Sequence, residues 1–237
     1  MSSTPAVVAL FVRVPIPGRV KTRLAAAIGD SEACRLYRAM VADVLTAIRD
    51  SGFPLWLFHD GEPGDAPPAD WTGGAAEIRP QSGGDIGERM AAAFADCFAA
   101  GIGRVILAGS DIPAIDAGLL QSAHFALEDH AAVFSPTVDG GYGLIGLRQD
   151  SFHRGIFRDI PWSTGLVMAT TLQCCRQYGL AVRQLQTLLD IDTVADLERY
   201  ADEPNQYAIM TNAVVGGLVA RRKKCMSCNK RILKEIS

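Results

Sequence analysis

The chain has few of the features that mark secreted, metal-rich or membrane proteins. Its 237 residues include six cysteines, two of them adjacent, and four histidines without metal-ligand spacing. No apolar run approaches the roughly 18 residues that a membrane span requires. No basic segment followed by an unbroken apolar stretch marks a secretory leader. These absences argue against a disulfide framework, and we expect a cytoplasmic protein with no membrane span.

Strong net charge is also missing. The formal charge is only −3, which argues against nucleic acid as a partner, since a nucleic-acid binder is usually strongly basic. The charge is unevenly spread, however: residues 221–237 carry a net charge of +6, which leaves −9 on the first 220 residues. Two common nucleotide motifs, G-x-x-x-x-G-K-[ST] and G-x-G-x-x-G, do not occur.

Apolar runs rich in β-branched residues alternate with segments of helical periodicity. The runs predict strands at 6–12, 53–60, 76–81, 104–109, 131–137, 143–147 and 180–186. Helices are predicted at 31–52, 87–101, 116–129, 163–179 and 193–202, with Ser31, Ser163 and Thr193 as caps, and residues 61–76 are predicted to be loop. This alternation predicts an α/β domain with a mainly parallel sheet.

A cationic loop follows the first strand. The segment PIPGRVKTRL places Arg19, Lys21 and Arg23 after two prolines and Gly18. Proline and glycine restrict such a loop to few conformations, and backbone N–H groups beside fixed cations bind anions well. A solvated basic turn is the alternative interpretation. We favour a phosphate site, because ligands of α/β sheets bind beyond the carboxyl ends of the strands.

Carboxylates follow three other strands. Asp111 ends the fourth strand, Asp139 precedes two glycines, and Asp190 and Asp192 follow the last strand. Hard cations such as Mg²⁺ or Mn²⁺ take oxygen ligands and leave positions for substrate phosphates. Helix capping is the alternative role for Asp111 and for Asp192. Together with the cationic loop, the acidic strand ends favour a metal–diphosphate site.

Five blocks in order resemble the bacterial glycosyltransferase-like family of the nucleotide-diphospho-sugar transferase (GT-A) superfamily. They are PIPGRVKTRL, GGDIGERM, GSDIP, DGGYGLIGL with IPWST, and DIDTVADL, within residues 7–200. The first block and RAMVADVLTAI are also similar to the 2-phospho-lactate guanylyltransferases. The resemblance implies a Rossmann-like GT-A fold, a three-layer α/β/α sandwich with a nucleotide-binding N-terminal half and an acceptor-binding C-terminal half.

The resemblance also implies roles for individual residues. It implies that Asp111 binds the metal and that Lys21 and Arg23 bind phosphate. On that basis we expect catalytic roles for Asp111, Lys21 and Asp139; nucleotide and phosphate binding by Arg13, Gly18, Lys21, Arg23 and Gly84; acceptor binding by Gly140, Gly141, Trp162 and Ser163; and metal binding by Asp111, Asp192 and Asp190. A packing role in the core is the alternative for Trp162. The chain departs from the family pattern at Arg13, where lysine is more usual, and at Gly143, where an aromatic residue is usual. A single D-x-P replaces D-x-D, so the second metal ligand has to come from Asp190 or Asp192.

Two chemistries need these same residues. In glycosyl transfer, an acceptor hydroxyl attacks the sugar of a nucleotide sugar, with Asp139 as base. In nucleotidyl transfer, a substrate attacks the α-phosphorus of a nucleoside triphosphate and pyrophosphate leaves. We favour glycosyl transfer to a small-molecule acceptor, because all five blocks point to that family. A non-catalytic nucleotide-binding protein is the third interpretation, but it predicts loss of carboxylates that are all present.

The C-terminal residues lie outside the resemblance. We expect a GT-A-like domain at 1–205 and a basic extension at 206–237. The extension carries one C-x-x-C, Cys225 and Cys228, whereas a structural zinc site needs four ligands. A solvated extension is the favoured interpretation. Redox-active thiols are one alternative, and zinc shared between two chains of a homodimer is another.

Overall fold

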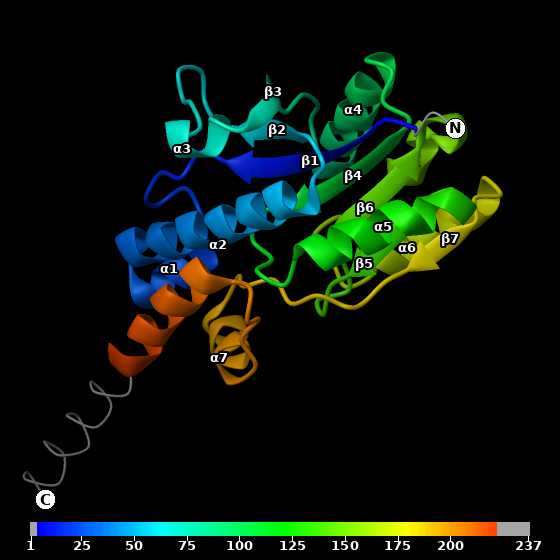
Figure 1. Cartoon of the computed structure of the whole chain (residues 1–237). Helices are drawn as coiled ribbons and strands as arrows, with labels where there is room; N and C mark the ends of the chain where they lie inside the picture. The colour runs from blue at the N-terminus through cyan, green and yellow to red at the C-terminus, as the bar shows by residue number, and fades with distance from the viewer. Residues whose placement is uncertain (1–3, 222–237) are drawn as a thin grey trace, which may run out of the picture.

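A seven-stranded mixed sheet forms the centre of the molecule (Figure 1). The computed structural model describes residues 4–221. The strands are β1 (Ala6–Arg13), β2 (Leu55–Asp60), β3 (Ala75–Pro80), β4 (Arg104–Gly109), β5 (Ala132–Pro136), β6 (Tyr142–Arg148) and β7 (Val182–Gln184), in the order β3-β2-β1-β4-β6-β5-β7. Only β6 runs antiparallel to its two neighbours among the described strands. The expected mainly parallel sheet is therefore confirmed.

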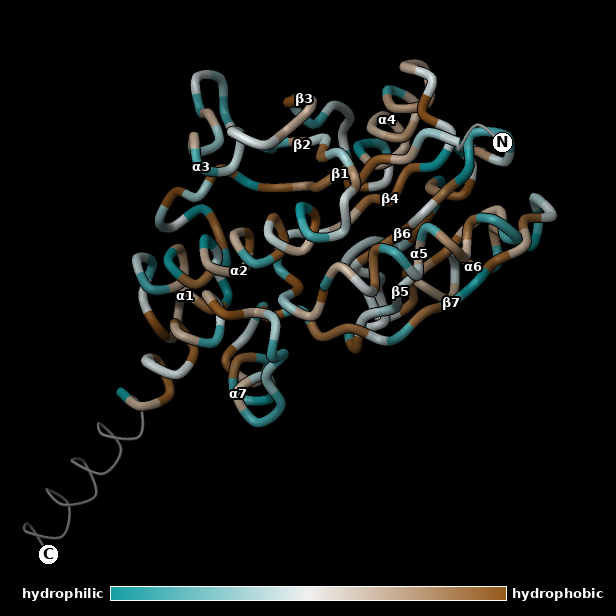
Figure 2. The backbone as a smooth tube through the Cα atoms, viewed as in Figure 1, coloured by the Kyte–Doolittle hydropathy of each residue, from teal (hydrophilic) through white to brown (hydrophobic). Residues whose placement is uncertain are grey.

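Helices cover both faces of the sheet, which makes three layers. On one face lie α1 (Thr22–Ile28), α2 (Asp30–Ser51) and α5 (Ala117–Asp129), and on the other α4 (Ile86–Ala99) and α6 (Val167–Gln177), with two short 3-10 helices, η1 (Gln149–Ser151) and η2 (Arg154–Phe157), after β6. The residues of β1 alternate between these faces: Val8, Leu10 and Val12 join one apolar core, whereas Val7 and Ala9 join the other. A strand buried on both faces reads as a continuous apolar run, and β1 is largely hydrophobic in Figure 2.

Two helix starts differ from the expectation. Helix α2 begins at Asp30, and Gly29, with φ of 87°, precedes it without a side-chain cap, so Ser31 is inside the helix. The glycine both ends α1 and starts α2, which leaves no capping position for the serine. Helix α6 begins at Val167, and Ser163 has a left-handed φ of 62°. Ser163 therefore belongs to a turn that precedes the helix and does not cap it.

The segment expected to be entirely loop contains a short helix, α3 (Ala69–Thr72). The burial of Trp71 explains why this helix forms. Its side chain lies in the same apolar core as Val8 and Leu10 of β1 and packs edge-on against Tyr37. Burial of a large aromatic side chain stabilises a local turn that the sequence pattern alone does not favour.

The C-terminal part of the described chain packs onto this body. Helix α7 (Val194–Asp202) begins with a capping box between Thr193 and Asp196, as expected for Thr193. Residues 209–221 form a further helix, whose apolar side chains pack into the same core as Val8 and Leu10 of β1. The boundary between residues 205 and 206 stays a prediction, and Cys225 and Cys228 lie outside the described residues. Within residues 4–221, no helix combines the length and the apolarity needed to cross a bilayer.

Candidate functional site

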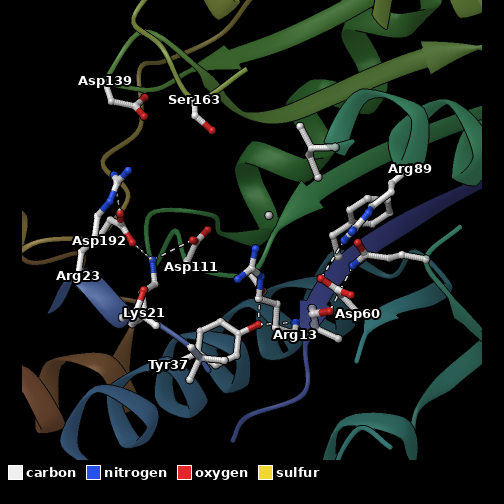
Figure 3. A pocket seen from close by; sticks show the side chains of 18 of the residues that line it. Arg13, Lys21, Arg23, Tyr37, Asp60, Arg89, Asp111, Asp139, Ser163 and Asp192 are labelled. Atoms are coloured by element: carbon white, nitrogen blue, oxygen red, sulfur yellow. Dashed lines mark hydrogen bonds and ion pairs between the residues drawn. The ribbon is translucent and has the colours of Figure 1, made fainter. Parts of the chain in front are cut away.

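A cavity of about 690 Å³ lies at the carboxyl edge of the sheet. The ends of β1, β2 and β4 line it, together with the start of α1 and the turn that contains Ser163. Parallel strands bring their carboxyl ends to one edge, so residues distant in sequence meet there. Figure 3 shows the cationic and acidic side chains pointing toward the same space.

Lys21 is the buried cation of this cavity. Its side chain is 4% exposed, and its Nζ lies 2.9 Å from Asp111 Oδ2 and 3.7 Å from Asp192 Oδ1. The residue has a left-handed backbone with φ of 50°, a conformation that costs a non-glycine residue about 1–2 kcal/mol. The loop thus holds an unfavourable conformation at the residue that places an ammonium between two carboxylates.

The other two loop cations diverge. Arg23 is exposed and its Nη1 donates to Asp192 Oδ2 at 3.1 Å, on the cavity wall. Arg19 points away and pairs with Glu62 and Asp65 at 3.1 Å each. Of the three cations that the sequence places on this loop, the structure brings Lys21 and Arg23 to the cavity.

Asp111 lies two residues beyond the end of β4 and does not cap the next helix, because Asp116 is the N-cap of α5. Partial burial of the Asp111 carboxylate opposes its ionisation, but the Lys21 ammonium and its hydrogen bond outweigh this effect. The pKa of Asp111 is therefore lowered from its ordinary value. Asp111 is a carboxylate at neutral pH.

Asp139 and Asp190 complete an acidic group around Asp111. Asp139 Oδ1 accepts hydrogen bonds from Thr137 Oγ1 at 2.5 Å and from the Gly141 N–H at 3.1 Å. Burial, followed by the negative charges of Asp139 and Asp111, raises the pKa of Asp190 to about 6. Mutual repulsion of this kind is what a bound cation would relieve.

Two of the three carboxylates expected to bind a metal ion are already engaged with Lys21. Asp111, Asp190 and Asp192 offer the oxygen ligands that Mg²⁺ or Mn²⁺ prefers, yet Lys21 already pairs with Asp111 and Asp192. Within residues 4–221, no three His, Cys, Asp or Glu side chains stand ready to hold a metal ion. The donor chemistry fits, but the Lys21 ammonium already neutralises two of the three expected ligands.

A hydrogen-bond network links the ends of β1 and β4. The Arg13 N–H donates to the Tyr37 hydroxyl at 2.8 Å, and this hydroxyl bonds to Ser110 Oγ at 2.9 Å. Burial raises the pKa of Tyr37 to about 12, although both hydrogen bonds oppose the shift. Tyr37 is thus a neutral phenol that fixes the backbone on which Arg13 and Asp111 stand. The Arg13 side chain lines the cavity.

Sequence reasoning missed three residues at the opposite end of the cavity. Asp60 ends β2, Gln81 follows β3, and Arg89 comes from α4. Arg89 Nη1 donates to Asp60 Oδ2 at 2.8 Å. The strand-end rule that found Asp111 also applies to Asp60 and Gln81, so their position as the last residues of two predicted strands was the available signal.

A second compartment of about 250 Å³ adjoins the cavity and shares Asp111, Asp139 and Ser163 with it. Its other lining is mainly apolar and includes Trp162. The Trp162 Nε1 is buried without a hydrogen-bond partner in the described part of the chain. A buried donor without a partner is costly, and its lack of exposed surface places this N–H inside the wall of the compartment.

The expected glycines take different positions. Gly141 lines the smaller compartment, and Gly140 touches Gly165 so closely that a side chain at Gly140 would collide with backbone. Gly18, with φ of 83°, and Gly84, whose N–H donates to Glu88 at 2.7 Å, are not among the residues that line either compartment.

Gly143, where an aromatic residue is usual in the resembling family, has no space for a side chain. A Cβ there would lie 2.0 Å from Ile112 Cδ1. The packing of Ile112 against Gly143 therefore leaves no room for the aromatic residue that the family usually has at this position.

Residues 43–164, just over half of the chain, match the model of DUF2064, described as an uncharacterized protein conserved in bacteria. The chain belongs to the DUF2064 family. No curated protein matches it.

Solved structures resemble this DUF2064 protein over nearly its whole length. A candidate nucleotide-diphospho-sugar transferase from Desulfovibrio desulfuricans G20 is 33% identical, with a TM-score of 0.84 over 91% of this chain and 97% of that chain. The synthetase of CMP:2-keto-3-deoxy-manno-octonic acid, complexed with CTP, is 13% identical, with a TM-score of 0.51 over 88% and 99%. Rv0371c from Mycobacterium tuberculosis H37Rv, in complex with manganese, is 15% identical, with a TM-score of 0.51 over 83% and 98%. The expected nucleotide-diphospho-sugar transferase fold of this DUF2064 protein is confirmed.

Proposed function

We propose that the protein is a nucleotide-diphospho-sugar transferase that moves a glycosyl group from a nucleotide sugar to a small acceptor. One observation carries the proposal: a large cavity lined by both cationic and carboxylate side chains adjoins a smaller, mainly apolar compartment, and the two share Asp111 and Asp139. Transfer between two substrates needs two sites with a common boundary. The similarity to the candidate Desulfovibrio transferase supports the same conclusion.

Lys21, Arg23 and Arg13 form the phosphate-binding side of the cavity. When the sugar leaves, negative charge grows on the departing nucleoside diphosphate. Fixed cations stabilise that charge with little reorganisation, and they act strongly where water is excluded. Lys21, which is almost fully buried, suits this role better than the exposed Arg23.

Asp111, Asp190 and Asp192 are the proposed ligands for Mg²⁺ or Mn²⁺. A divalent cation bound there would neutralise diphosphate oxygens and so make the nucleotide a better leaving group. Two of these carboxylates pair with Lys21, so we propose that the incoming diphosphate draws the ammonium to itself and frees them. The manganese complex of a protein with the same fold is consistent with this set.

The acceptor is proposed to lie in the smaller compartment, against Trp162, Ser163, Gly140 and Gly141. Asp139 stands on the boundary between the compartments. One oxygen of its carboxylate holds Thr137 and the Gly141 N–H. The other oxygen is left to accept the proton of an acceptor hydroxyl as it attacks the sugar.

The experiment is a panel of nucleotide sugars and nucleoside triphosphates, each with and without Mn²⁺, read by thermal shift. A ligand at about 100 times its Kd adds roughly 2.7 kcal/mol to the stability of the folded state. Stabilisation by a nucleotide sugar supports glycosyl transfer and names the donor. Stabilisation by a triphosphate alone would replace this proposal with nucleotidyl transfer, for which the same cations serve.

Turnover separates an enzyme from a nucleotide-binding regulator. The donor found in the panel is incubated with the protein and candidate acceptors, and release of nucleoside diphosphate is measured. We expect Asp111→Ala to lower this release by a factor on the order of 100 or more. A parent protein that binds the donor but never turns it over would favour the non-catalytic interpretation.

A further inference from the structure

We propose that the end of the cavity formed by Asp60, Gln81 and Arg89 recognises guanine, so that the nucleotide is a guanosine nucleotide. This inference rests on the proposed nucleotide-binding function and adds the identity of the base. Asp60 and Arg89 lie across the cavity from Lys21 and Asp111, with Arg13 between the two groups (Figure 3), and Gln81 lines the same cavity. That order suits phosphates at one end and a base at the other.

Asp60 presents one unused oxygen. Its Oδ2 accepts from Arg89 Nη1 at 2.8 Å, and Arg89 Nε donates to the Gly84 carbonyl at 3.3 Å. The second oxygen, Oδ1, has no hydrogen-bond partner within the described residues. Both side chains are about one third exposed, which keeps them accessible to a ligand while the arginine holds the carboxylate in place.

Gln81 presents a second acceptor. Its Nε2 donates to the carbonyls of Val12 and Phe58, at 3.2 Å each. A carboxamide has two N–H donors on one nitrogen and one acceptor oxygen. Because both donors are used by backbone carbonyls, the orientation of the amide is determined, and Oε1 remains as the group available to a ligand.

Two acceptors together select among the bases. Guanine has two adjacent donor groups, N1–H and the N2 amino group, and next to them an acceptor, O6. Adenine and cytosine have one amino group beside a ring nitrogen that accepts and would repel a carboxylate. Uracil has one N–H between two carbonyls. Guanine therefore satisfies both acceptors together, with its N2 amino group at Asp60 Oδ1 and its N1–H at Gln81 Oε1.

The first measurement is calorimetric titration of the intact protein with GDP, ADP, CDP and UDP. We expect GDP to bind at least about 10-fold more tightly than the other three, since a pair of hydrogen bonds to a base edge discriminates between bases by about this factor or more. Equal affinities for all four would overturn the inference while leaving the proposed function intact. Failure of every nucleotide to bind would instead contradict the proposed function.

A gain-of-function variant gives the sharper test. In Asp60→Asn, Arg89 would keep the amide oxygen and leave the NH₂ group facing the base. Xanthine has a carbonyl at C2, where guanine has its amino group, so the variant should lose affinity for GDP and gain affinity for xanthosine diphosphate. Gain of a new ligand cannot come from misfolding.

Asp65→Asn is the matched control, because Asp65 also pairs with an arginine, Arg19, and is not among the residues that line the cavity. It should keep the preference of the parent for GDP. If Asp60→Asn leaves the ratio of the GDP and xanthosine diphosphate affinities unchanged, the assignment of Asp60 to the base is wrong.

Discussion

The Lys21 ammonium lies 2.9 Å from Asp111 Oδ2, although these residues are 90 positions apart and Lys21 has a left-handed backbone. The same ammonium also reaches Asp192, which follows another strand. One lysine thus connects the cationic loop to two of the carboxylates expected to bind metal. If the proposed diphosphate and metal bind here, this ion pair is the state from which both of them bind.

Lys21 should therefore compete with a divalent cation. In Lys21→Met, Asp111 and Asp192 lose their shared partner, so Mn²⁺ alone should bind more tightly than in the parent. Nucleoside diphosphate should bind more weakly, by about 2 kcal/mol or roughly 30-fold, because a buried charge contact is removed. Titration of Mn²⁺ followed by electron paramagnetic resonance measures the first effect, and calorimetry the second.

Arg19→Met is the control for that experiment, because Arg19 is on the same loop but pairs with Glu62 and Asp65. It should leave both affinities within about twofold. Unchanged Mn²⁺ affinity in Lys21→Met would show that the ammonium does not occupy the cation position.

Asp190 should make the protein less stable as pH rises from about 4 to about 6. Its pKa is raised from 3.8 to about 6 in the folded protein, so the folded state binds more protons than the unfolded state in this window. Unfolding free energy therefore falls with rising pH. Partial exposure limits the effect to about 1–2 kcal/mol.

Asp190→Asn should flatten this dependence, and urea unfolding between pH 4 and pH 7 in the presence of a chelator measures it. Asp111 acts in the opposite direction, because its pKa is lowered and its contribution is lost on acidification. A variant whose stability falls as steeply as that of the parent would show that another group is responsible.

Gly143→Ala should destabilise the fold, because the added Cβ would lie 2.0 Å from Ile112 Cδ1 in a packed interior. Overpacking of this kind costs about 1–3 kcal/mol. Gly217→Ala is the opposite case: the residue is in the helix at 209–221 and no atom lies within 4 Å of the new Cβ. It should stabilise the protein by about 0.5–1 kcal/mol. Chemical denaturation compares the two, and equal effects would contradict the packing argument.

Asp43 should anchor the C-terminal helix. This buried carboxylate on α2 accepts the N–H groups of Met210 at 3.0 Å and Thr211 at 2.7 Å, at the start of the helix. In Asp43→Ala those donors lose a charged partner, which should cost about 1–3 kcal/mol. Limited proteolysis should then cleave between α7 and the helix sooner than in the parent.

Asp50→Ala serves as the comparison, since Asp50 is on the same helix but is exposed and pairs only with its neighbour Arg49 among the described residues. Its stability and its proteolysis pattern should match those of the parent. Similar losses in both variants would mean that the effect comes from α2 itself.

The sequence predicted the cavity through the ends of its strands. Apolar runs locate strands reliably when they are buried on both faces, as β1 and β4 are, and polar residues that follow such runs must gather at the edge. This logic was enough to place Lys21, Arg23, Asp111, Asp139 and Asp192 around one space. It needed only the direction of the strands, without their order.

The positions of the missed residues depend on the order of the strands in the sheet, which the hydrophobic periodicity of the sequence does not reveal. Asp60 and Arg89 meet because β2 lies next to β1 and α4 crosses behind them, which follows from the strand order. Ser163 was expected to cap a helix because serine favours that position. It instead has a left-handed backbone in a turn whose Gly165 packs against Gly140, and local propensity cannot predict such tertiary contacts.

The antiparallel strand β6 gives Asp139 an unusual setting. The chain reaches the ligand edge along β5 and leaves it along β6, so Asp139 sits at the tip of a hairpin, while Lys21 and Asp111 sit in connections that run on to helices. A hairpin tip can be lengthened, shortened or exchanged without rethreading any strand, because both of its ends stay anchored in the sheet. Under the proposed function, exchange of this one short turn would let relatives with this architecture take other acceptors, with the proposed nucleotide-binding half left as it is.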